Sequence, residues 1–168
     1  DECEAVGGYS IRLRFRGEAF LHPDIVECIR YAKEKGIKEV STLTNGVRID
    51  EDMFTEIMNL GIDWITFSID GVGEVYEKIR RPAKFDRVVE KLTNCAKIKK
   101  AAGKVKPVIK VQTIYPAISD NPDEFYNVFA PISDLVSSNP LQEAVTEDAM
   151  RHLPKVPEFV CPQLYQRL

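Results

Sequence analysis

Alternation between strand-like and helix-like segments is the feature that most restricts how this chain can fold. Apolar, β-branched or alternating segments predict strands at residues 10–15, 38–44, 63–69 and 107–115. Segments with helical patterning predict helices at residues 23–35, 50–60, 74–79, 85–101 and 122–129. Strands that are joined by helices form right-handed crossovers, so the alternation predicts an α/β fold with parallel strands. Such a sheet could be an open doubly wound sheet or part of a barrel.

The alternating pattern weakens after residue 129. Ser137-Ser138-Asn139-Pro140 predicts a loop, and prolines at positions 154, 157 and 162 interrupt the tail. We therefore expect a folded core over residues 1–136 and a connector over residues 137–160.

Composition and charge exclude several classes of protein. A length of 168 residues with 44% hydrophobic residues is enough for one domain with a substantial core. A net charge of −3 argues against nucleic-acid binding through a basic surface, and no apolar run approaches the ~20 residues of a membrane helix. The four cysteines, at positions 3, 28, 95 and 161, form no C-x-x-C pair. Free thiols in a reducing, cytoplasmic compartment are therefore expected.

The residues directly after the predicted strands are small, polar or turn-forming. These segments are residues 16–19, 44–46, 68–71 and 112–116. Parallel α/β folds bind their ligands at the carboxyl ends of the strands, so these segments would converge on one edge of the sheet. Taken singly, Asn45-Gly46 and Asp70-Gly71 are ordinary turn dipeptides, and Glu18 could simply cap a helix.

Taken together and in order, the strand-end segments resemble the radical S-adenosylmethionine (radical SAM) superfamily. The resemblance rests on residues 17–23 (GEAFLHP), 43–46 (LTNG) and 67–71 (FSIDG). Residues 76–86 (YEKIRRPAKFD) and 159–168 (FVCPQLYQRL) resemble the members that carry a C-terminal SPASM domain, which binds an auxiliary iron–sulfur cluster. On this resemblance, residues 161–168 would be the start of a truncated SPASM domain.

The resemblance implies both a fold and a chemistry. The implied fold is an incomplete (β/α)6 TIM-like barrel with parallel strands. In the family, a 4Fe–4S cluster held by C-x-x-x-C-x-x-C binds the amine and carboxylate of S-adenosylmethionine. Electron transfer from a reductant such as flavodoxin or ferredoxin then yields a 5′-deoxyadenosyl radical. This radical abstracts hydrogen from a peptide, protein or small-molecule substrate.

The resemblance also assigns cofactor contacts to the first three strand ends. Gly17 and Glu18 stand where the family has Gly-Glu-Pro, a motif that contacts the methionyl amine. A carboxylate is a suitable partner for an ammonium group. Ala19 replaces the proline of that motif. Asn45 would lie near the cofactor, and Ser68 matches a serine that reaches the methionyl carboxylate or the ribose.

Further contacts are implied beyond the third strand. Arg80 lies in a stretch from which the family often draws a carboxylate-binding arginine, and Arg81 is an equal candidate. Gln112 and Thr113 would face the barrel interior near the ribose or the substrate. Cys161 would bind the metal of an auxiliary cluster.

The sequence also departs from the family pattern. It contains no C-x-x-x-C-x-x-C motif, and Cys3 alone cannot hold a cubane cluster. We expect a fragment of a longer radical SAM enzyme, inactive by itself, rather than a degenerate protein. Two other functions stay open: a non-catalytic peptide- or small-molecule-binding module, and a barrel lyase or isomerase with Lys110 as a Schiff-base former.

Overall fold

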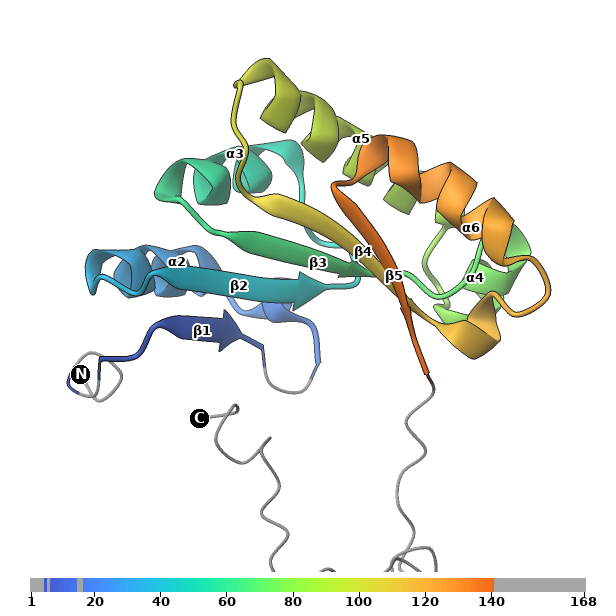
Figure 1. The fold of residues 1–168 in the computed structure, drawn as a ribbon, viewed down its shortest axis with the longest axis horizontal. Coiled ribbons are helices and arrows are strands. Elements are labelled where there is room, and N and C mark those ends of the chain that lie inside the picture. Colours follow the sequence, from blue (N-terminus) through green and yellow to red (C-terminus); the bar gives the residue numbers. More distant parts are fainter. Residues whose placement is uncertain (1–4, 6, 15–16, 141–168) are drawn as a thin grey trace, which may run out of the picture.

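In the part of the chain that the structure describes, five parallel strands form one sheet. The computed structural model describes residue 5, residues 7–14 and residues 17–140. The strands are β1 (Ser10–Leu13), β2 (Glu39–Thr44), β3 (Trp64–Ser68), β4 (Val108–Ile114) and β5 (Leu135–Asn139). They lie side by side in the order β1-β2-β3-β4-β5, and every neighbouring pair is parallel (Figure 1). The predicted α/β fold with a parallel sheet is thus confirmed.

The strand order decides between the two sheet types that the sequence left open. A doubly wound sheet reverses its strand order at a switch point, whereas here the spatial order equals the chain order. Right-handed crossovers without a reversal place all the helices on one face. The long helices are α2 (Ile25–Glu34), α3 (Glu51–Leu60), α5 (Phe85–Ala101) and α6 (Pro122–Phe129). The sheet is therefore wound in one direction only, and none of the described helices lies on its second face (Figure 1).

Shorter helical segments lie at the strand ends. They are η1 (Ala19–Leu21), α4 (Gly73–Ile79), η2 (Tyr115–Ala117) and η3 (Ala130–Ile132). The first three follow β1, β3 and β4, so they border the carboxyl edge of the sheet, where ligands bind in parallel folds. In the part of the chain that the structure describes, no helix has both the length and the hydropathy that a bilayer span requires.

Local signals in the sequence explain where helices begin and end, as α3 illustrates. Asp50 precedes the helix, and its side chain accepts a hydrogen bond from the Met53 amide at 2.8 Å. This cap satisfies one of the amides that have no partner within the helix. Gly61 ends the helix with a left-handed φ of 86°, a conformation that glycine adopts without strain.

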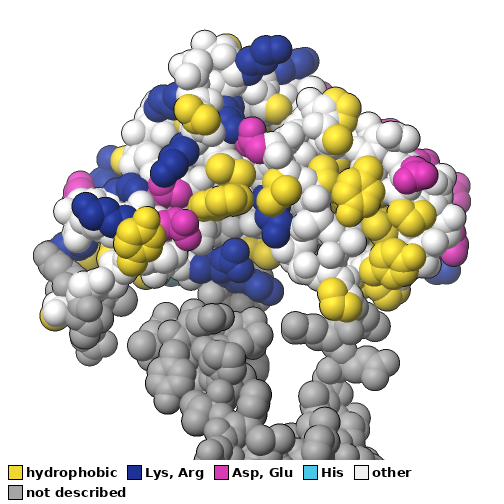
Figure 2. All heavy atoms as spheres, in the orientation of Figure 1, with side chains coloured by type: hydrophobic (Ala, Val, Ile, Leu, Met, Phe, Trp, Pro, Cys, Tyr) yellow, Lys and Arg dark blue, Asp and Glu magenta, His cyan; other side chains and the backbone are white. Residues whose placement is uncertain are grey.

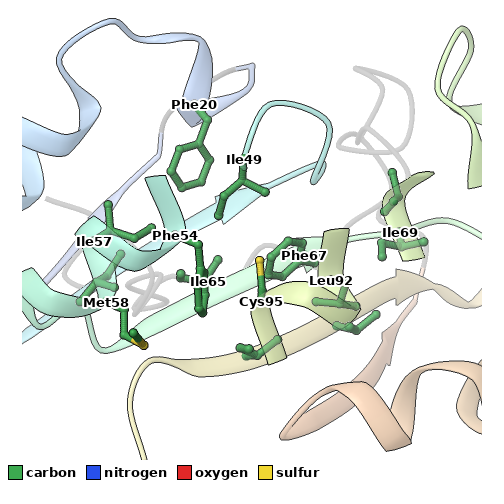
Figure 3. Close-up of a cluster of buried hydrophobic side chains, with 14 of the residues drawn as sticks. Phe20, Ile49, Phe54, Ile57, Met58, Ile65, Phe67, Ile69, Leu92 and Cys95 are labelled. Atoms are coloured by element: carbon green, nitrogen blue, oxygen red, sulfur yellow. The ribbon is translucent and has the colours of Figure 1, made fainter. Parts of the chain in front are cut away.

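A core of buried side chains joins the sheet to its helices. On β3, Ile65 and Phe67 are fully buried, and Phe54 of α3 and Leu92 of α5 pack against the same side of the sheet (Figure 3). Alternation along the strands turns every second residue away from this core. Because the core fixes the strands relative to one another, it also fixes the positions of their carboxyl ends.

The end of the described chain corrects one prediction. The loop expected at Ser137–Asn139 is wrong, because these residues complete strand β5, and the sheet therefore extends beyond the expected boundary at residue 136. Strand β5 pairs with β4, for example through Val136 with Val111 and Ser137 with Gln112. Serine and asparagine favour turns when considered locally, but pairing with an existing strand outweighs this weak preference.

Candidate cofactor-binding site

Glu18 lies at the carboxyl edge of the sheet and joins the loop after β1 to the end of β2. Its Oε1 accepts hydrogen bonds from the Thr44 hydroxyl at 2.6 Å and from the Phe20 amide at 3.2 Å. Its Oε2 accepts a hydrogen bond from the Asn45 amide at 2.6 Å. The predicted candidates Glu18 and Asn45 are therefore in direct contact.

The Glu18 carboxylate keeps capacity for one more donor. A carboxylate offers about four acceptor positions, and three are taken by Phe20, Thr44 and Asn45. Among the described residues, no lysine or arginine pairs with Glu18. The Glu18 carboxylate is thus a negatively charged acceptor without a cationic partner at the edge of a parallel sheet. An acceptor of this kind is chemically suited to bind an ammonium group.

The backbone around Gly17 places this carboxylate. Gly17 has a φ of 92°, in the left-handed region that glycine tolerates, and it lies directly before Glu18. Glu18 then acts as the N-cap of η1 through its bond with Phe20. Glu18 therefore does cap a helix, as the alternative interpretation of the sequence predicted. Its hydrogen bonds with Thr44 and Asn45 are not part of that cap.

Asn45 contributes to the site in two ways. Its backbone amide binds Glu18, and its side-chain Oδ1 accepts a hydrogen bond from the Val47 amide at 2.9 Å. The second bond is the local turn that the Asn45-Gly46 dipeptide predicts. In the described part of the chain the Asn45 side-chain NH₂ has no hydrogen-bond partner, so it is the group available to a ligand.

A second network lies at the end of β3, the strand next to β2. The Arg80 guanidinium donates to Ser68 Oγ at 2.9 Å through Nη2 and to Asp70 Oδ2 at 2.8 Å through Nε. Asp70 Oδ1 also accepts a bond from the Ile114 amide of β4 at 3.3 Å. This network links β3, β4 and the end of α4, and it brings the predicted candidates Ser68 and Arg80 into direct contact.

The two arginine candidates are distinguished by their contacts. Arg80 is half-buried and bound to Ser68 and Asp70, whereas Arg81 is exposed and lies in an open hollow beside α4. No described residue accepts a hydrogen bond from Arg80 Nη1. Because Arg80 is held in place and keeps a free donor, the structure favours it over Arg81 as the arginine of this site.

Asp70 is a member of this site that the sequence analysis treated only as part of a turn. Its carboxylate orients Arg80 and is itself largely buried. The signal that could have identified it is a carboxylate directly after a buried strand, followed by a cationic helix end.

Buried Tyr76 lies beside the network, and burial raises the pKa of its hydroxyl, with Arg80 opposing this shift and Asp70 adding to it. The hydroxyl is therefore neutral.

Gln112 and Thr113 do not share a face of the sheet, which corrects the expectation that both face the barrel interior. Gln112 is paired in register with Ser68, so the two side chains lie on the same, helix-free face. Thr113 is 1% exposed and lies on the face that the helices cover. Consecutive residues of a strand point to opposite faces, so only one of the two could face a ligand.

The described residues contain no metal-binding cluster. Among them, no three His, Cys, Asp or Glu side chains are placed to hold a metal ion. Cys28 is half-buried and Cys95 is buried, and both are free thiols, as predicted. Burial raises the pKa of Cys95 to about 12, so this thiol is unreactive. The predicted metal ligand Cys161 lies outside the described residues.

Comparisons with known proteins agree with the family that the strand-end segments resemble. A family model described as the Radical SAM superfamily matches residues 15–128, a segment that contains Glu18, Ser68 and Arg80. A domain of the pyruvate-formate lyase-activating enzyme from Bacteroides vulgatus has a similar fold, with a TM-score of 0.60 over 84% of this chain and 88% of that domain. Its sequence identity is only 10%, so this likeness concerns the fold alone.

Two curated relatives show sequence similarity over shorter segments. The Fe-coproporphyrin III synthase of Methanosarcina barkeri is 35% identical over 80 residues, or 47% of this chain. A probable GTP 3′,8-cyclase of Methanocaldococcus jannaschii is 30% identical over 132 residues, or 76% of this chain. The matched segments cover only 20% and 42% of these relatives.

Proposed function

Because this chain belongs to the radical SAM superfamily, we propose that the carboxyl edge of its sheet binds S-adenosylmethionine. The observation that carries the proposal is the Glu18 carboxylate, which has three hydrogen bonds to its own chain and one acceptor position left. The methionyl amine of the cofactor is an ammonium group at neutral pH and suits this position. The chemistry of the donor set therefore fits the cofactor.

Each candidate residue receives a distinct role in this proposal. Glu18 holds the methionyl amine, and Gly17 provides the turn that places it. Asn45 offers its side-chain NH₂ at the same strand end. Ser68 and Arg80 bind the methionyl carboxylate or the ribose hydroxyls, with Asp70 as a positioning residue that orients Arg80. Gln112, which is paired in register with Ser68, would contact the ribose or the substrate.

The second group that the family implies is a 4Fe–4S cluster, for which the described residues offer no ligand set. In the family, the cluster and S-adenosylmethionine together supply the radical that removes hydrogen from the substrate. We assign the residues of this chain to cofactor binding only. A SPASM domain with Cys161 as a ligand of an auxiliary cluster remains part of the proposal on sequence resemblance alone.

The substrate of the whole enzyme is proposed as a small molecule, with a peptide or protein as the alternative. Two of its relatives are an Fe-coproporphyrin III synthase and a probable GTP 3′,8-cyclase, whose names refer to small molecules. A protein reductant such as flavodoxin or ferredoxin would supply the electron.

Cofactor binding can be tested on the chain itself. We expect S-adenosylmethionine to shift amide resonances of Glu18, Asn45 and Ser68 in the ¹⁵N-labelled protein. Glu18→Gln should weaken binding at least about tenfold, because a charge-assisted hydrogen bond to the amine is lost. Glu27→Gln makes the same change of charge at an exposed position of α2 and should bind S-adenosylmethionine as the wild type does. Equal affinity of the Glu18 variant and the wild type would contradict the proposal.

Catalysis is tested on the longer protein that carries this segment. After anaerobic reconstitution with iron and sulfide, it should form 5′-deoxyadenosine from S-adenosylmethionine when reductant is added. A protein that binds the cofactor through Glu18 but forms no 5′-deoxyadenosine would instead support the non-catalytic binding module.

A further inference from the structure

The face of the sheet that carries no helices presents an unusual set of side chains. We call it the open face, and it consists of the strand residues that point away from the helices. In register rows from the amino to the carboxyl ends, these are Ser10 and Glu39; then Arg12, Ser41, Trp64 and Val108; then Leu43, Thr66, Lys110 and Leu135; then Ser68, Gln112 and Ser137; then Ile114 and Asn139. Figure 2 shows basic and hydrophobic side chains close together on the side of the molecule turned to the viewer.

The open face reverses the charge of the protein as a whole. The chain has a net charge of −3, yet the middle rows of this face contain two cations, Arg12 and Lys110, and no acid. Its one acidic residue among the described strands is Glu39, at the amino-terminal margin, where it accepts a hydrogen bond from Ser10 at 2.9 Å. The strand residues of these middle rows therefore carry two positive charges and no negative one, which favours an anion.

Lys110 differs from two other half-buried or buried lysines of the described chain, which each form an ion pair with a carboxylate. Lys33 binds Asp63 at 2.9 Å, and Lys99 binds Asp134 at 2.5 Å. Lys110 is half-buried in the middle of β4, and no described acid or carbonyl accepts a bond from it. Partial burial of a cation without a partner costs free energy, and an anionic ligand would offset this cost.

Ser137 gives a second, independent sign of a ligand on this face. Its hydroxyl oxygen is buried and has no hydrogen-bond partner in the described part of the chain. Ser137 is paired in register with Gln112, which in turn is paired with Ser68 of the candidate cofactor site. Buried polar atoms in folded proteins are almost always satisfied, so this hydroxyl needs a further partner, which a polar group bound on this face would provide.

The rows place Lys110 next to the candidate cofactor site and Arg12 across the open face from it. Lys110 precedes Gln112 by two residues on the same face, which corresponds to about 6.6 Å along the strand. Arg12 lies three strands away, or about 14 Å at about 4.8 Å per strand, and both side chains are long enough to reach into the space between. Trp64 and Thr66 occupy that space, one offering an aromatic surface and the other a hydroxyl.

We infer that the substrate is anionic, with a phosphate or carboxylate group held on the open face by Lys110 and Arg12. This inference rests on the proposed function, because it is the cofactor edge that makes the adjoining face a substrate site. Lys110 and Arg12 are then specificity-determining residues, and neither takes part in binding the cofactor.

Titration of the chain with simple anions tests the inference. The probes are inorganic pyrophosphate and citrate, with adenosine as an uncharged control, all at one fixed low ionic strength because salt screens exposed charges. Lys110→Gln and Arg12→Gln should each weaken binding of the preferred anion about tenfold, since each removes a charge-assisted hydrogen bond. Lys110→Arg should restore most of the affinity. Lys97→Gln, which removes an exposed lysine of α5, should bind as the wild type does.

The outcomes separate the two anion sources and the two proposals. A loss confined to pyrophosphate identifies a phosphate site, and a loss confined to citrate identifies a carboxylate site. Wild-type protein that binds neither probe, or an equal loss in the Lys97 variant, would overturn the inference. Lys110→Gln should retain the S-adenosylmethionine affinity of the wild type. If neither the wild type nor the variants bound S-adenosylmethionine, the proposed function would be wrong. The anion titrations would still test Lys110 and Arg12 separately.

Discussion

The Thr44 hydroxyl donates a hydrogen bond of 2.6 Å to Glu18 Oε1, so the last residue of β2 holds the carboxylate that follows β1. The same hydroxyl accepts a bond from the Gly46 amide at 3.0 Å. Thr44 is fully buried and therefore couples the stability of the sheet to the geometry of the candidate cofactor site.

Replacement of this threonine should affect both stability and binding. Thr44→Val keeps the shape of the side chain but leaves Glu18 and the Gly46 amide without one partner each. We expect the free energy of unfolding to fall by about 1–3 kcal/mol, the usual cost of an unsatisfied buried group. S-adenosylmethionine should bind more weakly, because Glu18 is no longer fixed. Urea unfolding and the cofactor titration measure the two effects.

Thr55→Val is the matched control for this prediction. The Thr55 hydroxyl donates to the Glu51 carbonyl within α3, far from Glu18. This variant should change neither property by much. A Thr44 variant with wild-type affinity for the cofactor would show that the threonine does not position Glu18.

The two neighbouring arginines should respond differently to the same conservative change. The Arg80 guanidinium donates to Ser68 and Asp70 from two different nitrogen atoms. Arg80→Lys has only one nitrogen at the end of its side chain and cannot reproduce both hydrogen bonds. We expect about tenfold weaker binding of S-adenosylmethionine, which corresponds to the loss of one charge-assisted hydrogen bond. Arg81→Lys changes an exposed side chain and should bind the cofactor as before. The reverse order of effects would transfer the role to Arg81.

Gly71 should tolerate no side chain. It has a φ of 91°, and an added Cβ would lie 2.6 Å from Val75 Cγ1 and 3.2 Å from the Ala117 carbonyl oxygen. Gly71→Ala combines backbone strain with this overlap, so we expect a loss of about 2–4 kcal/mol in the free energy of unfolding. The loop between Asp70 and α4 would shift, and Arg80 with it.

Gly103 provides the comparison for this change. It also has a left-handed φ, of 63°, but an added Cβ would meet nothing within 4 Å. Gly103→Ala should therefore cost only about 1 kcal/mol from backbone strain. Equal losses in the two glycine variants, measured by urea unfolding, would show that the contact with Val75 contributes nothing.

Periodicity and capping signals predicted most elements of the fold because they act locally. Helices α5 and α6 span the residues expected, Phe85–Ala101 and Pro122–Phe129. Strand β5 was not predicted, because Ser137–Asn139 form a strand only through pairing with β4. Local preference carries no information about a partner strand that lies elsewhere in the chain.

The candidate site shows the same division between local and distant information. Glu18, Asn45 and Ser68 were expected at one edge because strand ends converge in a parallel fold, and the structure has Glu18 bound to Asn45 and Ser68 at the end of the next strand. The sequence could mark Asp70 as a candidate by its place after a buried strand, but it could not give its partners, because the contacts with Arg80 and Ile114 form only on folding.

Acid should destabilise the protein through Asp63, at the opposite edge of the sheet. Burial by itself would raise the pKa of this carboxyl, but hydrogen bonds from Lys106, the Val40 amide and Lys33 outweigh burial and hold the pKa below its ordinary value. A carboxyl whose pKa is lower in the folded state stabilises that state above the unfolded pKa of about 3.9, and this stability is lost as the pH falls through the folded pKa.

Asp63→Asn should therefore change both the size and the pH dependence of stability. At pH 7 we expect a loss of about 3 kcal/mol in the free energy of unfolding, because Lys33 and Lys106 lose their shared anionic partner. Between pH 5 and pH 3, roughly the range over which an aspartate protonates, the variant should lose less stability than the wild type. Asp120→Asn, at an exposed position, should follow the wild-type curve. Parallel curves for the Asp63 variant and the wild type, from urea unfolding at each pH, would show that Asp63 does not set the acid sensitivity.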